Sequence, residues 1–305
     1  MAIFLVSAMA LGQGSFTVVA AKVNPKLVKL FGAGGFKGLP SYGTGVLISP
    51  KGYILTVNNH ILTTSDLRVH VYDGRAFHAK VLAREPDLDL AILKMEEDVD
   101  FLPHYDLAAV SKQPMAEAGD WVLAMSNCFQ VATRDEPMSV QRGVIASVTE
   151  LRGRRGIFDA AFAGDVYFID AITNNPGSAG GAVVDRKGQL LGIIGRELKN
   201  NLTDTWINYA IPIQAKIQYQ DEKKKKTETM NVAEFAAKAI DGSYKEREKP
   251  KHEVAVNFTG IILVPNPVMA TPPYIDEVIP GSPAAQVGLR PDDLIIYVDG
   301  ELVPT

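Results

Sequence analysis

Three separated segments carry residue types that together suit acyl-transfer chemistry. His60 ends the segment GTGVLISPKGYILTVNNH, Asp89 stands directly before the apolar run LAILK, and residues 174–181 read NNPGSAGG. An imidazole can take a proton from a hydroxyl group, a carboxylate can fix the tautomer of that imidazole, and the N–H groups of a glycine-rich turn can bind an oxyanion. The order base, acid, turn is one in which such triads occur.

Other residues compete for these roles, and the sequence context decides between them. Asp87 is the nearest rival for the acid, but the register of DLAILK favours Asp89. His70 and His78 lie in alternating segments that are typical of surface strands. The sequence contains no H-x-x-x-H pair, paired cysteines or dense carboxylate run, so we expect no metal site and no cofactor.

The elements that must position these residues read as short strands. Between Ser15 and Ile213, segments of about four to nine residues are rich in Val, Ile, Leu and Tyr, beginning with FTVVAAKV at 16–23. Turn sequences such as SPKG, YDGR and DRKG separate them. Many short strands at regular spacing predict a mainly β fold, built as a sandwich or a pair of barrels.

Composition and the first residues narrow the class of protein. The 305 residues are 47% apolar and 22% charged, with a net charge of −4, which is typical of a soluble globular chain and gives no reason to expect a nucleic-acid partner. The single cysteine, Cys128, excludes an intrachain disulfide. Residues 2–11 are apolar, and Ser7, Ala8 and Ala10 suit a cleavage site. We therefore expect a signal-like segment at 1–20 and an exported, periplasmic or extracellular protein.

A charged stretch follows the predicted strands, and we interpret residues 217–253 as a linker. Its KKKK run at 223–226 is interpreted as a solvated face. Asn231 and Glu234 have the spacing of a capping box, and Gly242 can end a helix. The apolar residues between them share one helical face, so we expect a short amphipathic helix that docks onto one domain. These residues are Val232, Phe235, Ala236, Ala239 and Ile240.

The three chemical segments resemble the HtrA/DegP-type serine proteases, in which a trypsin-like domain precedes a PDZ domain. In that family they read close to G-S-G-V-I-I-S-x-x-G-Y-I-L-T-N-N-H-V, D-x-x-T-D-L-A-V-L-K and N-P-G-N-S-G-G. The resemblance covers about residues 25–215 and implies a trypsin-like double β-barrel at 21–216. It implies that His60 is the general base, that Asp89 orients it, and that the N–H groups of Gly177 and Ala179 form the oxyanion hole.

The chain departs from the family at the nucleophile. The family motif G-x-S-G-G reads Gly-Ser-Ala-Gly-Gly here, so Ala179 occupies the position of the catalytic serine. A methyl group has no lone pair to attack with, and losing a triad nucleophile costs on the order of 10⁶ in turnover. Ser178 is a poor substitute, because neighbouring side chains in a tight turn point in different directions. The family loop G-N-P-F-G has also changed, to SNCFQ at 126–130, which favours natural divergence over a Ser-to-Ala change made for study.

The resemblance implies a specificity pocket in the peptidase domain. Thr173 falls near the base of that pocket, and Ile193, Ile194 and Gly195 fall on its wall. These residue types predict that the pocket accepts a small or aliphatic side chain.

The last segment, 254–305, resembles part of a PDZ domain. Phe258, Gly260 and Ile261 match the carboxylate-binding loop, and PGSPAAQVGLRPDDLIIYVDGELV matches a specific PDZ signature, with Asp292 where the family usually has glycine. PDZ domains bind C-terminal peptides along a sheet edge. We expect the remainder of this domain to follow Thr305.

Three functions are consistent with these features. The first is a catalytically silent peptidase fold of protein quality control that binds unfolded or extended polypeptides. The second is an active serine endopeptidase, of which this sequence is a Ser-to-Ala copy, and the third is an adaptor that recruits partners through its PDZ domain. Trimers are common in the family, so a homotrimer is a further expectation.

Overall fold

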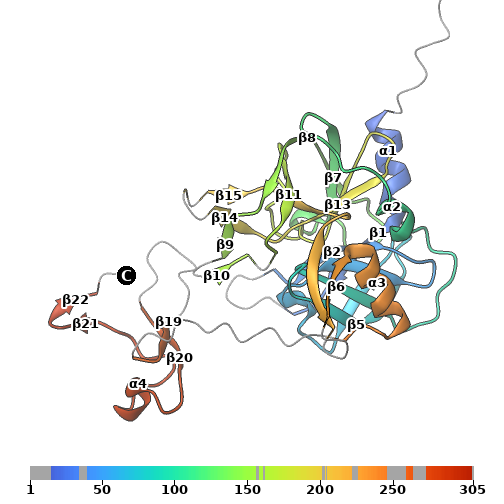
Figure 1. Cartoon of the computed structure of the whole chain (residues 1–305). Coiled ribbons are helices and arrows are strands. Elements are labelled where there is room, and N and C mark those ends of the chain that lie inside the picture. Colours follow the sequence, from blue (N-terminus) through green and yellow to red (C-terminus); the bar gives the residue numbers. More distant parts are fainter. Residues whose placement is uncertain are drawn as a thin grey trace, which may run out of the picture. The chain divides into compact units, whose positions relative to one another are not determined.

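The computed structural model describes residues 15–33, 40–155, 158–160, 162–200, 203, 205–221, 226–245, 259–263 and 273–303. The chain divides into two compact units, one of residues 1–153 with 160–247 and the other of residues 154–159 with 248–305. The first unit contains two closed six-stranded barrels (Figure 1). The prediction of a mainly β, trypsin-like double barrel is therefore confirmed.

The first barrel has the strand order β1-β2-β3-β6-β5-β4, with neighbours antiparallel. Its strands are β1 (Leu27–Phe31), β2 (Tyr42–Leu47), β3 (Tyr53–Val57), β4 (Leu67–His70), β5 (Ala76–Glu85) and β6 (Leu90–Met95). Most residues of β3 and β6 are buried, because alternate side chains of each strand pack into two different hydrophobic clusters. The pairing places Val57 opposite Leu90.

The second barrel has the order β11-β16-β13-β12-β7-β8. Its strands are β7 (Trp121–Ser126), β8 (Ser139–Glu150), β11 (Asp165–Ile169), β12 (Ala182–Val184), β13 (Leu190–Ile194) and β16 (Tyr209–Pro212). Shorter elements lie between these strands in the sequence. They are η1 (Asn24–Lys26), η2 (His60–Leu62), α2 (Leu107–Val110), η3 (Cys128–Gln130), β9 (Gly153–Arg155), β10 (Phe158–Asp159), β14 (Leu198–Asn200) and β15 (Trp206–Ile207).

The first described element is a helix, α1 (Phe16–Val23), so the strand predicted for these residues is wrong. Ser15 caps the helix, since its side chain accepts a hydrogen bond from the Thr17 N–H at 3.3 Å. Val19 and Val23 lie one helical turn apart and are buried in the core that both barrels share. Burial of this face outweighs the strand preference of β-branched residues. The predicted cleavage residues Ser7, Ala8 and Ala10 lie outside the described residues.

Within the stretch that we interpret as a linker with a docking helix, residues 216–241 form a hairpin and a helix that belong to the barrel unit. Strands β17 (Lys216–Asp221) and β18 (Lys226–Asn231) pair with each other, and α3 (Val232–Asp241) follows directly. The predicted capping box of Asn231 and Glu234 is present, and Gly242 ends the helix in the left-handed conformation. The predicted docking of this helix is thus confirmed, with the barrels as its partner.

The buried face of α3 is slightly narrower than predicted. Val232, Phe235, Ala236 and Ala239 are buried in the shared core, whereas Ile240 is exposed. Beyond the helix, the Tyr244 ring packs edge-on against Phe235, and its hydroxyl donates to the backbone carbonyl of Arg84 at 2.9 Å. This contact fixes the end of the segment to β5.

Among the described residues from 259 onward, the second unit contains four short strands and one helical turn. They are β19 (Ile261–Leu263), β20 (Ile275–Val278), α4 (Pro283–Gln286), β21 (Tyr297–Val298) and β22 (Glu301–Leu302). Ser282 caps α4 by accepting from the Ala285 N–H at 3.2 Å. Among the residues described, no helix has the length and apolar character needed to cross a membrane.

We predict that Phe235→Ala destabilises the barrel unit by about 3–5 kcal/mol, because it removes a fully buried ring and leaves a cavity in the shared core. Ile240→Ala on the same helix is the matched control and costs about 1 kcal/mol or less, since this side chain is exposed. Urea unfolding of both variants measures the difference. Equal small losses would show that α3 is not part of the barrel core.

Candidate functional site

The fold brings the predicted base and acid to the same end of one strand pair. His60 begins η2, three residues after β3, and Asp89 directly precedes β6. Because Val57 of β3 lies opposite Leu90 of β6, the two segments leave the barrel side by side. The Asn58 N–H donates to the Asp89 carbonyl at 2.9 Å, which holds the segments together.

The Asp89 carboxylate forms an ion pair with Arg196. The side chain of Asp89 is only 5% exposed, and its Oδ2 atom accepts from the Arg196 Nε–H at 2.6 Å. Arg196 follows β13 of the second barrel, so this pair links the two barrels. Asp89 also has a positive φ of 57°, a left-handed conformation that aspartate tolerates better than most residues.

His60 is engaged by a different group. Its Nε2 atom lies 2.7 Å from the carbonyl oxygen of Pro40, and its buried Nδ1 atom has no hydrogen-bond partner. A carbonyl oxygen only accepts hydrogen bonds, so the proton of a neutral ring is assigned to Nε2. A triad base needs the opposite tautomer, with Nδ1–H donating to the acid and a lone pair on Nε2. The structure therefore places His60 and Asp89 in adjacent segments without a hydrogen bond between their side chains.

The glycine-rich turn retains the backbone geometry of an anion site. Gly177 has a φ of +84°, and a Cβ there would lie 2.3 Å from the carbonyl oxygen of Asn127. The hydroxyl of Thr44 links the turn to the neighbouring loop, because it donates to the Gly177 carbonyl at 2.7 Å and accepts from the Asn127 N–H at 2.8 Å. Within the described part of the chain, the N–H groups of Gly177 and Ala179 donate to no other protein group. Both remain available for an oxyanion.

Ser178, which precedes the predicted nucleophile position, is buried in the protein. Its side chain is 1% exposed, and its Oγ accepts a hydrogen bond from the Ser126 hydroxyl at 3.3 Å. Ala179 is half-buried, and its carbonyl oxygen accepts from the Thr44 N–H at 3.3 Å. The hydroxyl of Ser178 therefore lies against β7 of the second barrel.

The predicted specificity-pocket residues pack inside the second barrel. Thr173, Ile193 and Ile194 are buried. Gly195 is covered by the ring of Tyr209, which a Cβ at Gly195 would approach to 2.1 Å. Burial raises the pKa of the Tyr209 phenol far above its ordinary value; the charge of Asp89 adds to this, and Arg196 opposes it. As placed, these four residues are a packed wall, and their role in specificity stays a prediction.

Two features of the site were missed by sequence reasoning. Arg196 is one; the signal for it was a cation directly after the apolar strand LLGII and the predicted pocket wall. The other is Phe129, whose N–H donates to the Pro176 carbonyl beside the oxyanion turn at 2.9 Å. Phe129 is 60% exposed and Val131 is also exposed, so an apolar surface adjoins the turn.

The second unit preserves the turns that the PDZ resemblance requires. Gly260 has a φ of +74°, its carbonyl accepts from the Ile279 N–H at 3.0 Å, and Ile261 begins β19. Asp292, which replaces a glycine of the family, adopts a φ of +71° and therefore keeps a left-handed turn. The third predicted loop residue, Phe258, lies outside the described residues.

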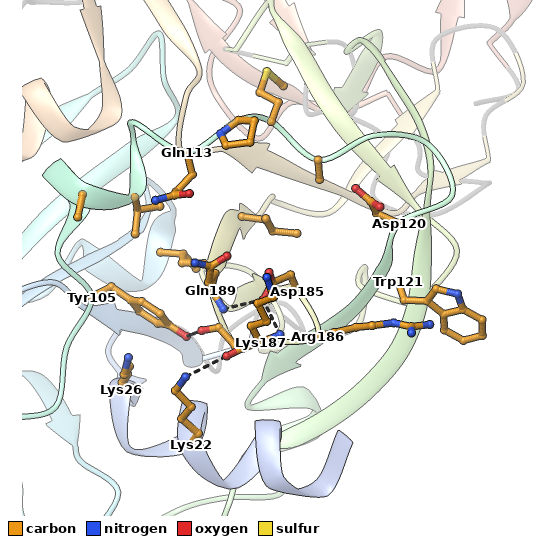
Figure 2. A pocket seen from close by; sticks show the side chains of 18 of the residues that line it. Lys22, Lys26, Tyr105, Gln113, Asp120, Trp121, Asp185, Arg186, Lys187 and Gln189 are labelled. Atoms are coloured by element: carbon orange, nitrogen blue, oxygen red, sulfur yellow. Dashed lines mark hydrogen bonds between the residues drawn. The ribbon is translucent and has the colours of Figure 1, made fainter. Parts of the chain in front are cut away.

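A cavity of about 720 Å³ lies elsewhere in the barrel unit (Figure 2). It is bounded by α1, α2 and the 185–189 turn, and none of the predicted site residues lines it. Lys22 donates to the Lys187 carbonyl at 3.0 Å, and the ammonium group of Lys26 lies 4.1 Å from the centre of the Tyr105 ring. Burial and the charge of Lys22 lower the pKa of Lys26. Among the described residues, no group of three or more His, Cys, Asp or Glu side chains is arranged to hold a metal.

Family comparisons agree with the two units. Residues 43–193 match the trypsin-like peptidase domain and residues 274–305 match the PDZ domain. A probable periplasmic serine endoprotease, DegP-like, from Chlamydia pneumoniae is 27% identical over 288 residues, which are 88% of this chain and 51% of that protein. Serine protease HTR4 from Rattus norvegicus is 28% identical over 285 residues, or 87% of this chain and 50% of that protein. The chain thus spans about half the length of these curated relatives.

Two solved structures share the fold. A serine-to-alanine variant of the HtrA-type protease AlgW, with tripeptide, has a TM-score of 0.52 and 24% identity, covering 96% of this chain and 85% of that one. The MamO protease domain from Magnetospirillum magneticum, in its apo form, has a TM-score of 0.50 and 23% identity, covering 63% of this chain and 94% of that one.

We predict that Gly177→Ala destabilises the barrel unit more than Gly74→Ala does. Both glycines have a φ of +84°, so both substitutions incur the left-handed cost of about 1–2 kcal/mol. Only at Gly177 would the new Cβ meet backbone at 2.3 Å, and relieving such overpacking costs about 1–3 kcal/mol more. Chemical unfolding measures both variants, and equal losses would contradict the turn geometry described here.

Proposed function

From a chain that has an HtrA/DegP-type trypsin-like peptidase domain followed by a PDZ domain, we propose a catalytically silent member of this serine protease family that binds unfolded or extended polypeptides. The observation that carries the proposal is the methyl group of Ala179 where the family has its attacking hydroxyl. Without that oxygen no acyl-enzyme forms, whatever the state of the other groups.

The surroundings of Ala179 support the same proposal independently. A Ser-to-Ala exchange removes only the hydroxyl of the nucleophile and no atom of the hydrogen bond between base and acid, so by itself it gives no reason for that bond to be lost. Here the base bonds to Pro40 and the acid to Arg196. The absence of a base–acid hydrogen bond, added to the missing nucleophile, favours a silent protein over a copy of an active one.

The site keeps features that suit polypeptide binding without cleavage. The N–H groups of Gly177 and Ala179 can bind a carbonyl oxygen of a peptide. Beside them, the exposed side chains of Phe129 and Val131 offer apolar contact to an extended chain. One solved relative is described as an HtrA-type protease with tripeptide, which is consistent with peptide binding on this fold.

The proposal extends to the second unit and to the location of the protein. By its family, the PDZ domain takes C-terminal peptides at a sheet edge, near Gly260 and Ile261. Several relatives are named as periplasmic, so we propose an exported protein. A homotrimer stays a prediction, and size-exclusion chromatography with light scattering would test it.

We predict that the unmodified chain shows no covalent labelling by a fluorophosphonate probe, because such probes need an activated serine. Ser178→Ala is the control, since Ser178 is the serine closest in sequence to the vacant nucleophile position. Intact-mass spectrometry reads the adduct. Labelling of the chain that disappears in Ser178→Ala would identify a working nucleophile and overturn the silent assignment.

We further predict that Phe129→Ser weakens binding of reduced, unfolded casein about tenfold, equivalent to ~1.4 kcal/mol. The matched control is Phe101→Ser, because Phe101 is also exposed, at 94%, and also has a positive φ, but lies apart from the glycine-rich turn in sequence. Fluorescence anisotropy of labelled casein measures both affinities. An equal effect of the two substitutions would argue against a binding surface beside the oxyanion turn.

A further inference from the structure

We propose that Arg196 is a positioning residue that keeps the Asp89 carboxylate away from His60, so that restoring a serine at position 179 does not by itself restore a triad. This inference rests on the proposed function and concerns the same site. It assigns the uncoupling of base and acid to one side chain of the second barrel.

The first step is the electrostatic requirement of Asp89. A carboxylate that is 95% buried in its side chain needs a cation or several hydrogen-bond donors, because removing its charge from water is costly. In a triad, the imidazole N–H and the imidazolium meet part of this need. Here the Arg196 guanidinium meets it with a charge-assisted bond of 2.6 Å.

The second step is the fixed position of Arg196. It follows β13 and Gly195, whose backbone N–H donates to the Tyr209 carbonyl at 3.1 Å. The ring of Tyr209 covers Gly195. The charge of Asp89 raises the pKa of the Tyr209 phenol and the charge of Arg196 lowers it, in addition to the larger effect of burial. The packed end of β13 therefore fixes the position from which the Arg196 guanidinium contacts Asp89. The side chain of Arg196 is only 23% exposed.

The third step is the consequence for His60. Because its Nδ1 atom is buried without a partner, the ring lacks the acceptor that would draw the proton onto Nδ1. The Pro40 carbonyl stabilises the Nε2–H form instead. In that tautomer no Nε2 lone pair faces position 179, so a serine placed there would have no base.

Fluorophosphonate labelling tests the inference in a serine-restored background. We compare Ala179→Ser alone, Ala179→Ser with Arg196→Met, and Ala179→Ser with Arg75→Ala. Methionine keeps the aliphatic stem of arginine but not its charge. Arg75 is the control, because it also pairs with an aspartate, Asp73, on the exposed surface.

We expect Ala179→Ser to label slowly and the added Arg196→Met to raise the labelling rate at least about tenfold, whereas Arg75→Ala leaves it unchanged. Rapid labelling of Ala179→Ser alone, or the same rate with and without Arg196→Met, would overturn the inference. A pH–rate profile for the double variant should show the imidazole titration that a base coupled to its acid confers.

Nitrogen-15 NMR of His60 tests the inference without any nucleophile. In the unmodified chain we expect the Nε2–H tautomer, and in Arg196→Met a strongly deshielded Nδ1–H proton bound to Asp89. An Nδ1–H proton bound to a carboxylate in the unmodified chain would overturn the inference even if the variants fail to fold. Labelling of the unmodified chain by the probe would instead overturn the proposed function and leave the tautomer result standing.

Discussion

The burial of one carboxylate constrains the whole candidate site. Asp89 lies directly before the start of β6, and because its side chain is buried its charge must be balanced within the protein. In a working triad that balance couples the acid to the base. In this chain it couples the acid to Arg196, across the two barrels. The same interaction that holds the barrel ends together therefore leaves the base without its orienting partner.

The remaining parts of the site are held by interactions that do not depend on catalysis. Thr44 ties the oxyanion turn to the loop at Asn127, and Thr56 donates to the Thr44 carbonyl at 2.7 Å. These buried bonds keep Gly177 in its left-handed conformation whether residue 179 carries a hydroxyl or a methyl group. The geometry of this turn therefore does not depend on a hydroxyl at residue 179, because the turn is part of the structural core.

Sequence alone predicted the parts of this protein that depend on local patterns. The two barrels, the capping box at Asn231 and the placement of His60 and Asp89 in neighbouring segments all follow from strand spacing, turn residues and motif order. The strand predicted for 16–23 failed because tertiary burial of Val19 and Val23 outweighed the preference of β-branched residues. The helix expected within 217–253 and its docking onto a domain also followed from local pattern, and its apolar face completes the shared core.

The partner of Asp89 could not be predicted, because the two residues are 107 positions apart and no local pattern connects them. A motif shows which residue types are present, but not which cationic side chain pairs with a buried carboxylate. That outcome depends on geometry: Arg196 extends from a strand end packed against Tyr209, while the Nε2 atom of His60 already has a carbonyl partner. A histidine and an aspartate at the triad positions of a sequence are therefore weak evidence for a working triad whenever another cationic side chain lies within reach of the acid.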